Sequence, residues 1–252
     1  MDGPDDKLPP AAFIEAAKEA EIAIQRGLQM YPDNSELLSA EATFKEHLDQ
    51  TARAQQALER AFNLNPRQDW LAVRLARKYQ ASGDWQNSKR VLDACLRDNP
   101  SSKLAHLEMG RVLIASSDST AAIEHLRRGF TEGDHHYEAQ FWYARELFLQ
   151  GHFAEAEKLF SALNDRAPGR FRTRAAAPVE RDQTPIVYDC RVERKEEGYA
   201  FLKLPQFPKD VFASRAESDL AEWDKLYTGA TAKCALAFSR RGARAISVSF
   251  CS

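Results

Sequence analysis

The sequence predicts a multidomain α + β chain, in which a solenoid of helical hairpins precedes a small five-stranded β-barrel. Prolines recur every 34 residues over the first two thirds of the chain, and after Pro185 the apolar period changes from 3.6 towards two residues. The charge also divides: residues 169–252 carry 15 Lys+Arg against 11 Asp+Glu, and the remainder carries 20 against 26. The C-terminal part is therefore the one expected to meet an anion.

The 34-residue period defines the helical hairpins. Pro32, Pro66 and Pro100 follow this spacing, Asp134 replaces the next proline, and Pro168 restores the series. A proline ring cannot continue a helix, so each proline is expected to end the second helix of a hairpin.

Small and large apolar residues accompany each proline at fixed offsets. Small residues allow two helices to approach closely, and large ones fill the space between hairpins. The small positions are Ala20, Ala54, Ser88, Ala122 and Ala156, and the large positions are Ile24, Leu58, Leu92, Leu126 and Phe160. Gly83 and Gly151 suit the left-handed turns between paired helices.

These registers resemble the tetratricopeptide repeat (TPR) family over residues 11–168. Pro4, Pro9 and Pro10 stand where the first helix of the first unit would lie, so we expect a half repeat followed by four units. Residues 1–10 are expected to be a disordered N-terminus. The resemblance implies stacked hairpins whose first helices line a concave surface that binds a protein partner.

Three arginines occupy one repeat position. Arg77, Arg111 and Arg145 are 34 residues apart, Arg74 precedes Arg77 by one helical turn, and Trp142 belongs to the last unit. The resemblance places this position in the groove, where guanidinium groups suit an acidic peptide or a nucleic-acid backbone. Alternatively, these arginines pair with neighbouring acids such as Glu108 or Glu146.

Residues 169–185 are predicted to be an extended connector rich in arginine and proline. Its cations are Arg170, Arg172, Arg174 and Arg181. The segment is either a solvated linker or an electrostatic arm beside the barrel.

Five short strands are predicted within residues 186–250, which are expected to form a closed barrel. Their ranges are 186–192, 198–202, 210–213, 232–238 and 245–248. Glu197-Gly198-Tyr199-Ala200-Phe201-Leu202 and Val211-Phe212-Ala213-Ser214 resemble the two nucleic-acid motifs of the cold-shock domain, which has the oligonucleotide-binding (OB) fold. Three departures put binding in doubt: Val192 replaces a tryptophan of the family, Glu197 a lysine, and Ser214 a histidine.

Alternation along strands places Tyr199, Phe201 and Phe212 on one face, where they would form a platform for unpaired bases. Cations expected to follow the phosphates around it are Arg191, Lys195, Lys209, Arg241 and Arg244. Two interpretations remain open: the barrel binds single-stranded nucleic acid, RNA before DNA, or it serves as a docking module for protein.

Motifs of catalysis are missing from the sequence. It contains no GxxxxGK[ST], GxGxxG, HExxH or GxSxG pattern, no CxxC pair and no apolar run of membrane-spanning length. We therefore expect a cytoplasmic adaptor or scaffold that is not an enzyme, has no cofactor or metal, does not enter membranes, and keeps Cys95, Cys190, Cys234 and Cys251 reduced. The alternative is a protein-interaction or sensor region that regulates a catalytic partner without binding nucleic acid.

Overall fold

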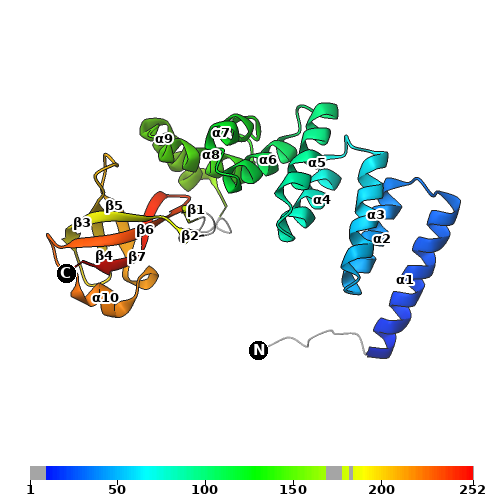
Figure 1. Cartoon of the computed structure of the whole chain (residues 1–252), viewed down its shortest axis with the longest axis horizontal. Helices are drawn as coiled ribbons and strands as arrows, with labels where there is room; N and C mark the ends of the chain where they lie inside the picture. The colour runs from blue at the N-terminus through cyan, green and yellow to red at the C-terminus, as the bar shows by residue number, and fades with distance from the viewer. Residues whose placement is uncertain (1–9, 169–177, 182–183, 252) are drawn as a thin grey trace. The chain divides into compact units, whose positions relative to one another are not determined.

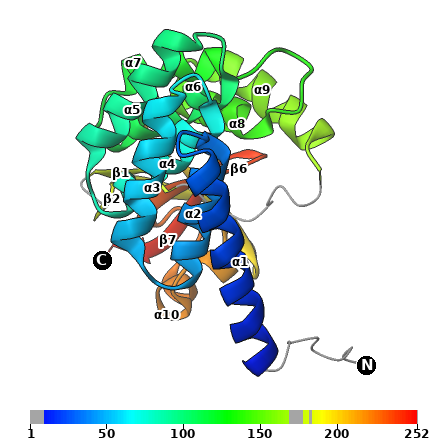
Figure 2. The ribbon, with the colours of Figure 1, turned by 90° about the vertical axis from the view of Figure 1, so that its right-hand side faces the viewer.

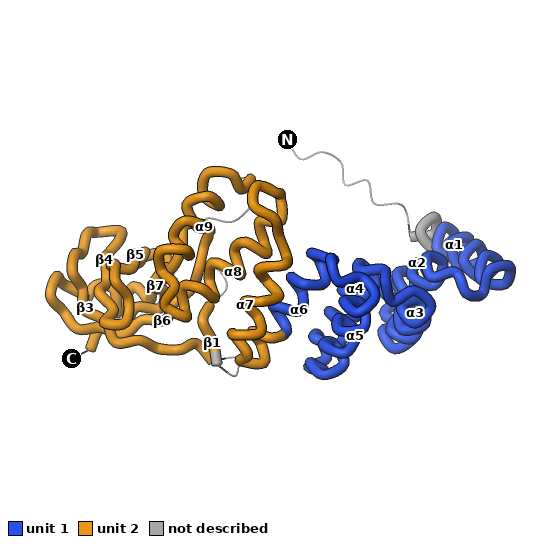
Figure 3. The backbone as a smooth tube through the Cα atoms, turned by 90° about the horizontal axis from the view of Figure 1, so that it is seen from above, with its two compact units in different colours: residues 1–112 blue, residues 113–252 orange. Residues whose placement is uncertain are grey.

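The computed structural model describes residues 10–168, 178–181 and 184–251, and it describes the side chains of these residues from Glu15 onward, except that of Arg181. The chain divides into two compact units, residues 1–112 and 113–252 (Figure 3). The predicted disordered N-terminus, apart from Pro10, lies outside the described residues. The same holds for most of the predicted connector, including Arg170, Arg172 and Arg174.

The first unit consists of helices (Figure 1). They are α1 (Pro10–Met30), α2 (Ser35–His47), α3 (Thr51–Leu64), α4 (Asp69–Ala81), α5 (Trp85–Asp98) and α6 (Lys103–Ala115), whose last residues belong to the second unit. Side chains cap three of the helix starts, because Asn34 accepts from the Leu37 N–H at 2.9 Å, Asp84 from the Asn87 N–H at 3.0 Å and Ser102 from the Ala105 N–H at 3.0 Å. Helices α3 and α5 each end two residues before a proline of the 34-residue series.

The predicted hairpin core is confirmed in the complete pairs of helices. Ala54 and Leu58 of α3 are fully buried, as are Ser88 and Leu92 of α5. Helix α1 differs because no helix precedes it among the described residues, and Ala20 is exposed. It packs on α2 instead, where a Cβ at Gly27 would meet the Leu37 side chain at 3.1 Å.

The second unit begins with three further helices: α7 (Ser119–Arg128), α8 (Tyr137–Leu149) and α9 (Phe153–Arg166). Helices α8 and α9 lie side by side (Figures 1 and 2). The turn between them places Gly151 at φ +87°, and the turn between α4 and α5 places Gly83 at φ +77°. Both glycines therefore adopt the left-handed conformation that the sequence predicted.

A closed five-stranded barrel follows in the same unit. Its strands are β3 (Val187–Lys195), β4 (Tyr199–Lys203), β5 (Val211–Ser214), β6 (Thr231–Ser239) and β7 (Gly242–Phe250). The order around the barrel is β3-β4-β5-β7-β6, and β6 closes it by pairing with β3. All pairs are antiparallel except β5 with β7, which is parallel. The five strands coincide with the predicted ranges to within a few residues.

Two parts of this region were not predicted. A 3-10 turn (Arg215–Glu217) and helix α10 (Leu220–Lys225) connect β5 to β6, and Trp223 of α10 is fully buried. The end of the predicted connector forms a two-stranded ladder of β1 (Glu180–Arg181) and β2 (Thr184–Pro185). Val179, just before β1, is buried and donates its N–H to the Leu236 carbonyl of β6 at 2.9 Å.

Five phenylalanines, which we call the junction cluster, join the barrel to α8 and α9. They are Phe148, Phe153, Phe160, Phe207 and Phe238. The Phe148 ring lies 5.0 Å from Phe207 and 5.5 Å from Phe238, measured between centroids. Phe160 stacks on Phe238 at 6.0 Å, and Phe238 is fully buried. The last hairpin and the barrel therefore share one apolar core.

Candidate functional site

The first candidate surface is a hollow of about 520 Å³ lined by α2, α4 and α6. Its lining residues are Glu46, Trp70, Val73, Arg74, Arg77, Lys78, Ala81 and Leu104. Arg74 and Arg77 belong to the predicted groove. Trp70 and Lys78 do not, although they stand one helical turn before and after Arg74 and so share its face of α4. That i, i+4 spacing was the signal that could have found them.

Glu46 fixes two of the hollow's cations. Its carboxylate accepts from Arg74 Nη2 at 2.9 Å and forms an ion pair with Lys78 Nζ at 2.7 Å. Burial by itself would raise the pKa of Glu46, but the hydrogen bonds from Lys78 and Arg74 outweigh burial and hold the pKa below its usual value. The carboxylate is therefore ionised at neutral pH, and it orders both cations at the wall of the hollow.

Glu108, which is fully buried, orders the side chain of Arg77 in the same way. Its Oε2 accepts from Arg77 Nε at 3.1 Å and Nη2 at 2.8 Å, and its Oε1 accepts from Gln80 at 3.1 Å. Arg111 lies 3.7 Å from the same carboxylate. The side chain of Arg77 nevertheless stays 51% exposed, so pairing with Glu108 and access to a ligand coexist at this position.

Arg145, the third arginine of the series, has different surroundings from the first two. Its side chain is 5% exposed and forms an ion pair with Glu146. The guanidinium lies 5.3 Å from the Trp142 ring, 5.7 Å from the Phe238 ring and donates to the Pro178 carbonyl at 3.0 Å. The prediction that all three arginines line one open groove is therefore corrected: Arg145 lies beneath the barrel, and Trp142 is half-buried beside it.

The second candidate surface, which we call the open cluster, consists of Tyr199, Phe201 and Phe212. Their ring centroids lie 5.8–6.0 Å from one another, and all three rings are half-buried on one face of β4 and β5. Tyr199 and Phe212 are close to parallel, and Phe201 meets both edge-on. The structure thus brings together the three aromatic residues that strand alternation grouped.

Two cations flank the open cluster, and each has a carboxylate partner. Arg244 lies 5.1 Å above Phe212 and 3.0 Å from Glu217. Arg194, which the sequence analysis did not select, lies 5.9 Å above Tyr199 and 2.8 Å from Glu196. The positive charge beside the rings is therefore largely balanced.

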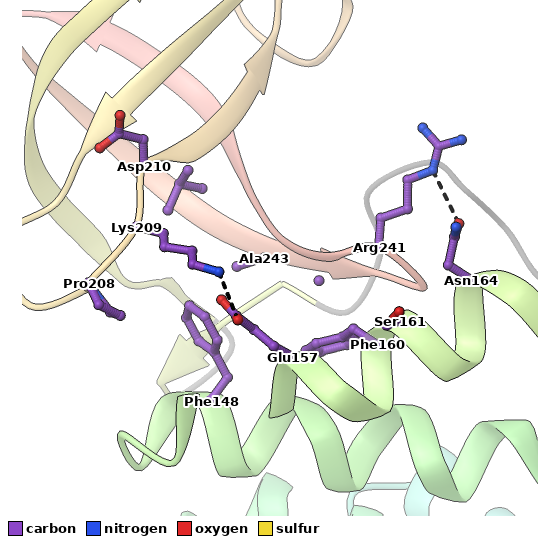
Figure 4. Close-up of a pocket in the computed structure, with 12 residues that line it drawn as sticks. Phe148, Glu157, Phe160, Ser161, Asn164, Pro208, Lys209, Asp210, Arg241 and Ala243 are labelled. Carbon is purple, nitrogen blue, oxygen red and sulfur yellow. Dashed lines mark hydrogen bonds and ion pairs between the residues drawn. The ribbon is translucent and has the colours of Figure 1, made fainter. Parts of the chain in front are cut away.

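The remaining predicted cations of the barrel lie in other surroundings. Arg191 is exposed on β3, and Lys195 Nζ lies 5.7 Å above the buried Trp223 ring. Lys209 and Arg241 line a pocket of about 380 Å³ against α9 (Figure 4). There Lys209 forms an ion pair with Glu157 at 2.8 Å, and Arg241 Nε donates to Asn164 at 3.4 Å. These two belong to the junction with the helices and not to the surroundings of the open cluster.

Val192 is fully buried inside the barrel, so its side chain faces the core and not a ligand. The valine at this position therefore removes no aromatic group from the surface. Ser214 is the last residue of β5, whereas Glu197 lies two residues before β4, and its carbonyl accepts from the Trp223 indole at 3.3 Å.

All four cysteines are free thiols, and Cys95, Cys190 and Cys234 are buried. Burial raises the pKa of Cys95 to about 11. Among the described residues, no three His, Cys, Asp or Glu side chains gather as a metal site would require, and no helix has both the length and the apolarity to cross a bilayer.

Comparisons with known proteins agree with the helical architecture. Two family models, both described as tetratricopeptide repeat, match residues 73–135 and 113–177. The described helices within these residues therefore have the TPR hairpin architecture. A search of curated proteins finds no match.

Two solved structures resemble the helical part of this chain. YrrB, described as a TPR protein with an unusual peptide-binding site, is 18% identical over 58% of this chain and 76% of its own, with a TM-score of 0.50. PilF of Pseudomonas aeruginosa is 11% identical over 62% of this chain and 72% of its own, with a TM-score of 0.53. At these identities the likeness concerns the TPR fold alone.

Proposed function

We propose that this chain is a non-enzymatic adaptor whose TPR region binds an acidic segment of a partner protein in the hollow of α2, α4 and α6. The observation that carries the proposal is the convergence of Arg74, Arg77 and Lys78 on one hollow beside the exposed Trp70. Guanidinium groups bind carboxylates through two parallel hydrogen bonds, and an exposed indole offers apolar contact at the same place.

The arrangement of the acidic residues supports the binding of an acidic ligand. Glu108 is fully buried beneath Arg77, and Glu46 is engaged by both Arg74 and Lys78. Glu108 therefore supports Arg77 from behind, whereas Glu46 holds Arg74 and Lys78 in place from the wall of the hollow. Preorganised cations lose little side-chain entropy when a ligand arrives, which favours binding.

The test uses the full chain and fluorescein-labelled octaglutamate, with octaglutamine as the uncharged probe. Lys78→Gln should weaken octaglutamate binding about fivefold, which corresponds to about 1 kcal/mol. Lys89→Gln on α5 is the matched control, because Lys89, like Lys78, is paired with an acid but lies outside the hollow. Equal losses in both variants, or no saturable binding at low salt, would overturn the proposal.

A second candidate function concerns the barrel, for which we propose weak binding of single-stranded nucleic acid, RNA before DNA. The open cluster favours it, because half-exposed aromatic rings can stack on bases regardless of sequence. The strand order and the position of α10 between the third and fourth barrel strands support assignment to the OB fold. The cold-shock-like motifs lie on β4 and β5, which carry the three rings.

The balanced charge around the open cluster bears on how such binding would work. Arg194 and Arg244 already have carboxylate partners, so stacking would supply most of the free energy and phosphate contacts little. The same balance suits the alternative, in which the barrel docks a protein and the chain regulates a catalytic partner without nucleic acid. Binding of a single-stranded oligonucleotide by the full chain, or its absence at low salt, separates these two functions.

A further inference from the structure

Equivalent arginines of the repeat series differ in exposure. The side chains of Arg77 and Arg111 are 51% and 36% exposed, whereas that of Arg145 is 5% exposed. Each of the three lies near a carboxylate, Glu108 for the first two and Glu146 for the third. Ion pairing is therefore common to all three arginines. Other residues must shield the Arg145 side chain from solvent.

The cover comes from the segment that leads into the barrel. Pro178 presents its backbone carbonyl to Arg145 Nη2 at 3.0 Å. The next residue, Val179, is buried, donates its N–H to Leu236 and accepts from the Ile186 N–H, each at 2.9 Å. An extended piece of main chain, held against β6, thus offers an acceptor to an arginine of a first helix. This is the way an extended peptide ligand would meet that arginine.

The barrel completes the cover with an aromatic ring. Phe238 of β6 lies 5.7 Å from the Arg145 guanidinium, and it also contacts Phe148 and Phe160 of the last hairpin. Arg145 is thereby enclosed between the Trp142 ring, the Phe238 ring and the Pro178 carbonyl.

We propose that the chain supplies its own ligand for the last TPR hairpin: the segment at Pro178 and Val179, with Phe238, permanently occupies the position of Arg145. An external ligand can then use Arg77 and Arg111 but not Arg145. This second statement rests on the proposed function of the TPR hollow, whereas the internal occupation of Arg145 does not.

Occupation is tested by arginine modification with phenylglyoxal on the folded full chain, read residue by residue by mass spectrometry. Arg77 and Arg111 should react at least about tenfold faster than Arg145, because only Arg145 is enclosed while all three are near a carboxylate. Comparable rates at Arg111 and Arg145 in the native protein would overturn the proposal.

A matched pair of variants tests which segment provides the cover. Val179→Asp should release the segment and raise the Arg145 rate several-fold, while Val187→Asp, at an exposed valine of β3, should leave it unchanged. An unchanged Arg145 rate in folded Val179→Asp would contradict the proposal. If this variant loses the near-ultraviolet circular dichroism of the native barrel, the wild-type rates decide.

Octaglutamate binding tests the consequence for external ligands. Arg111→Ala should raise the dissociation constant at least threefold, and Arg145→Ala should leave it within twofold. A loss of affinity in folded Arg145→Ala would overturn the second statement. Absence of octaglutamate binding in the wild type would refute the proposed function of the hollow, while the modification rates would still decide whether Arg145 is occupied.

Discussion

The barrel carries two aromatic clusters with different surroundings. The junction cluster is closed: Phe238 is fully buried, and rings from α8 and α9 pack directly on it. The open cluster of Tyr199, Phe201 and Phe212 has similar spacing between rings, yet all three stay half-exposed. Ring spacing therefore does not distinguish a core from a binding surface, and the distinction lies in whether the chain itself supplies the opposing face.

The largest expected difference between the clusters is in stability. Phe238→Ala should lower the free energy of unfolding by about 3–5 kcal/mol, because it leaves a cavity beside Phe148 and Phe160. Phe201→Ala should cost no more than about 1 kcal/mol, because part of the side chain is already in water. Urea titrations of the full chain measure both, and equal losses would mean that the open cluster is also a structural core.

Binding should show the reverse order. Tyr199→Ala or Phe212→Ala should each weaken binding of a fluorescent single-stranded oligonucleotide by about 1–3 kcal/mol, because each removes a stacking surface. Phe153→Ala in the junction cluster should leave binding unchanged where the protein stays folded. Fluorescence anisotropy at low salt gives these affinities. If the wild type shows no saturable binding there, the barrel is better explained as a docking module for protein.

Salt dependence separates stacking from charge. Arg191→Ala should flatten the slope of log affinity against log salt by about 0.7 if Arg191 contacts one phosphate of a single strand. Tyr199→Ala should keep the slope and lower the affinity. A slope that Arg191→Ala does not alter would show that this exposed cation is not part of the nucleic-acid surface.

The smallest effect on stability and binding is expected at the exposed ion pair between the barrel and α9. Lys209 forms an exposed ion pair with Glu157 of α9, and such pairs contribute about 0–1 kcal/mol. Lys209→Ala should therefore change the unfolding free energy little and leave the salt slope of oligonucleotide binding unaltered. A flattened slope would show that Lys209 contacts a phosphate, as the sequence predicted.

Much of the fold could be predicted because its signals are local. Helix-ending prolines and buried small residues such as Ala54 and Ser88 repeat along the chain, and strand alternation marked all five barrel strands. Helix α10 was missed because six residues give no readable period, and its start depends on the Asp219 side chain capping the N–H groups of Ala221 and Glu222. The ladder of β1 and β2 was missed because Val179 is held by β6, far away in the sequence.

The candidate sites also differ in whether they depend on local signals or on contacts between residues far apart in the sequence. Tyr199, Phe201 and Phe212 were grouped correctly, because residues on neighbouring strands share a face by alternation. Arg145 was misplaced because its burial depends on a carbonyl 33 residues away, and no repeat period records that contact. Arg241 was misplaced for a similar reason, since its neighbour Asn164 belongs to α9.

The junction cluster also has a consequence for the end of the helical stack. A solenoid exposes an apolar side at its last repeat, and natural repeat proteins shield it with a terminal element whose outer surface is polar. Here Phe160 of α9 is shielded by Phe238 of the barrel, whose exposed strand positions include Glu193 and Arg194. The barrel thus serves as the cap of the helical stack, and a version ending at residue 168 would expose the apolar surface around Phe160 to solvent.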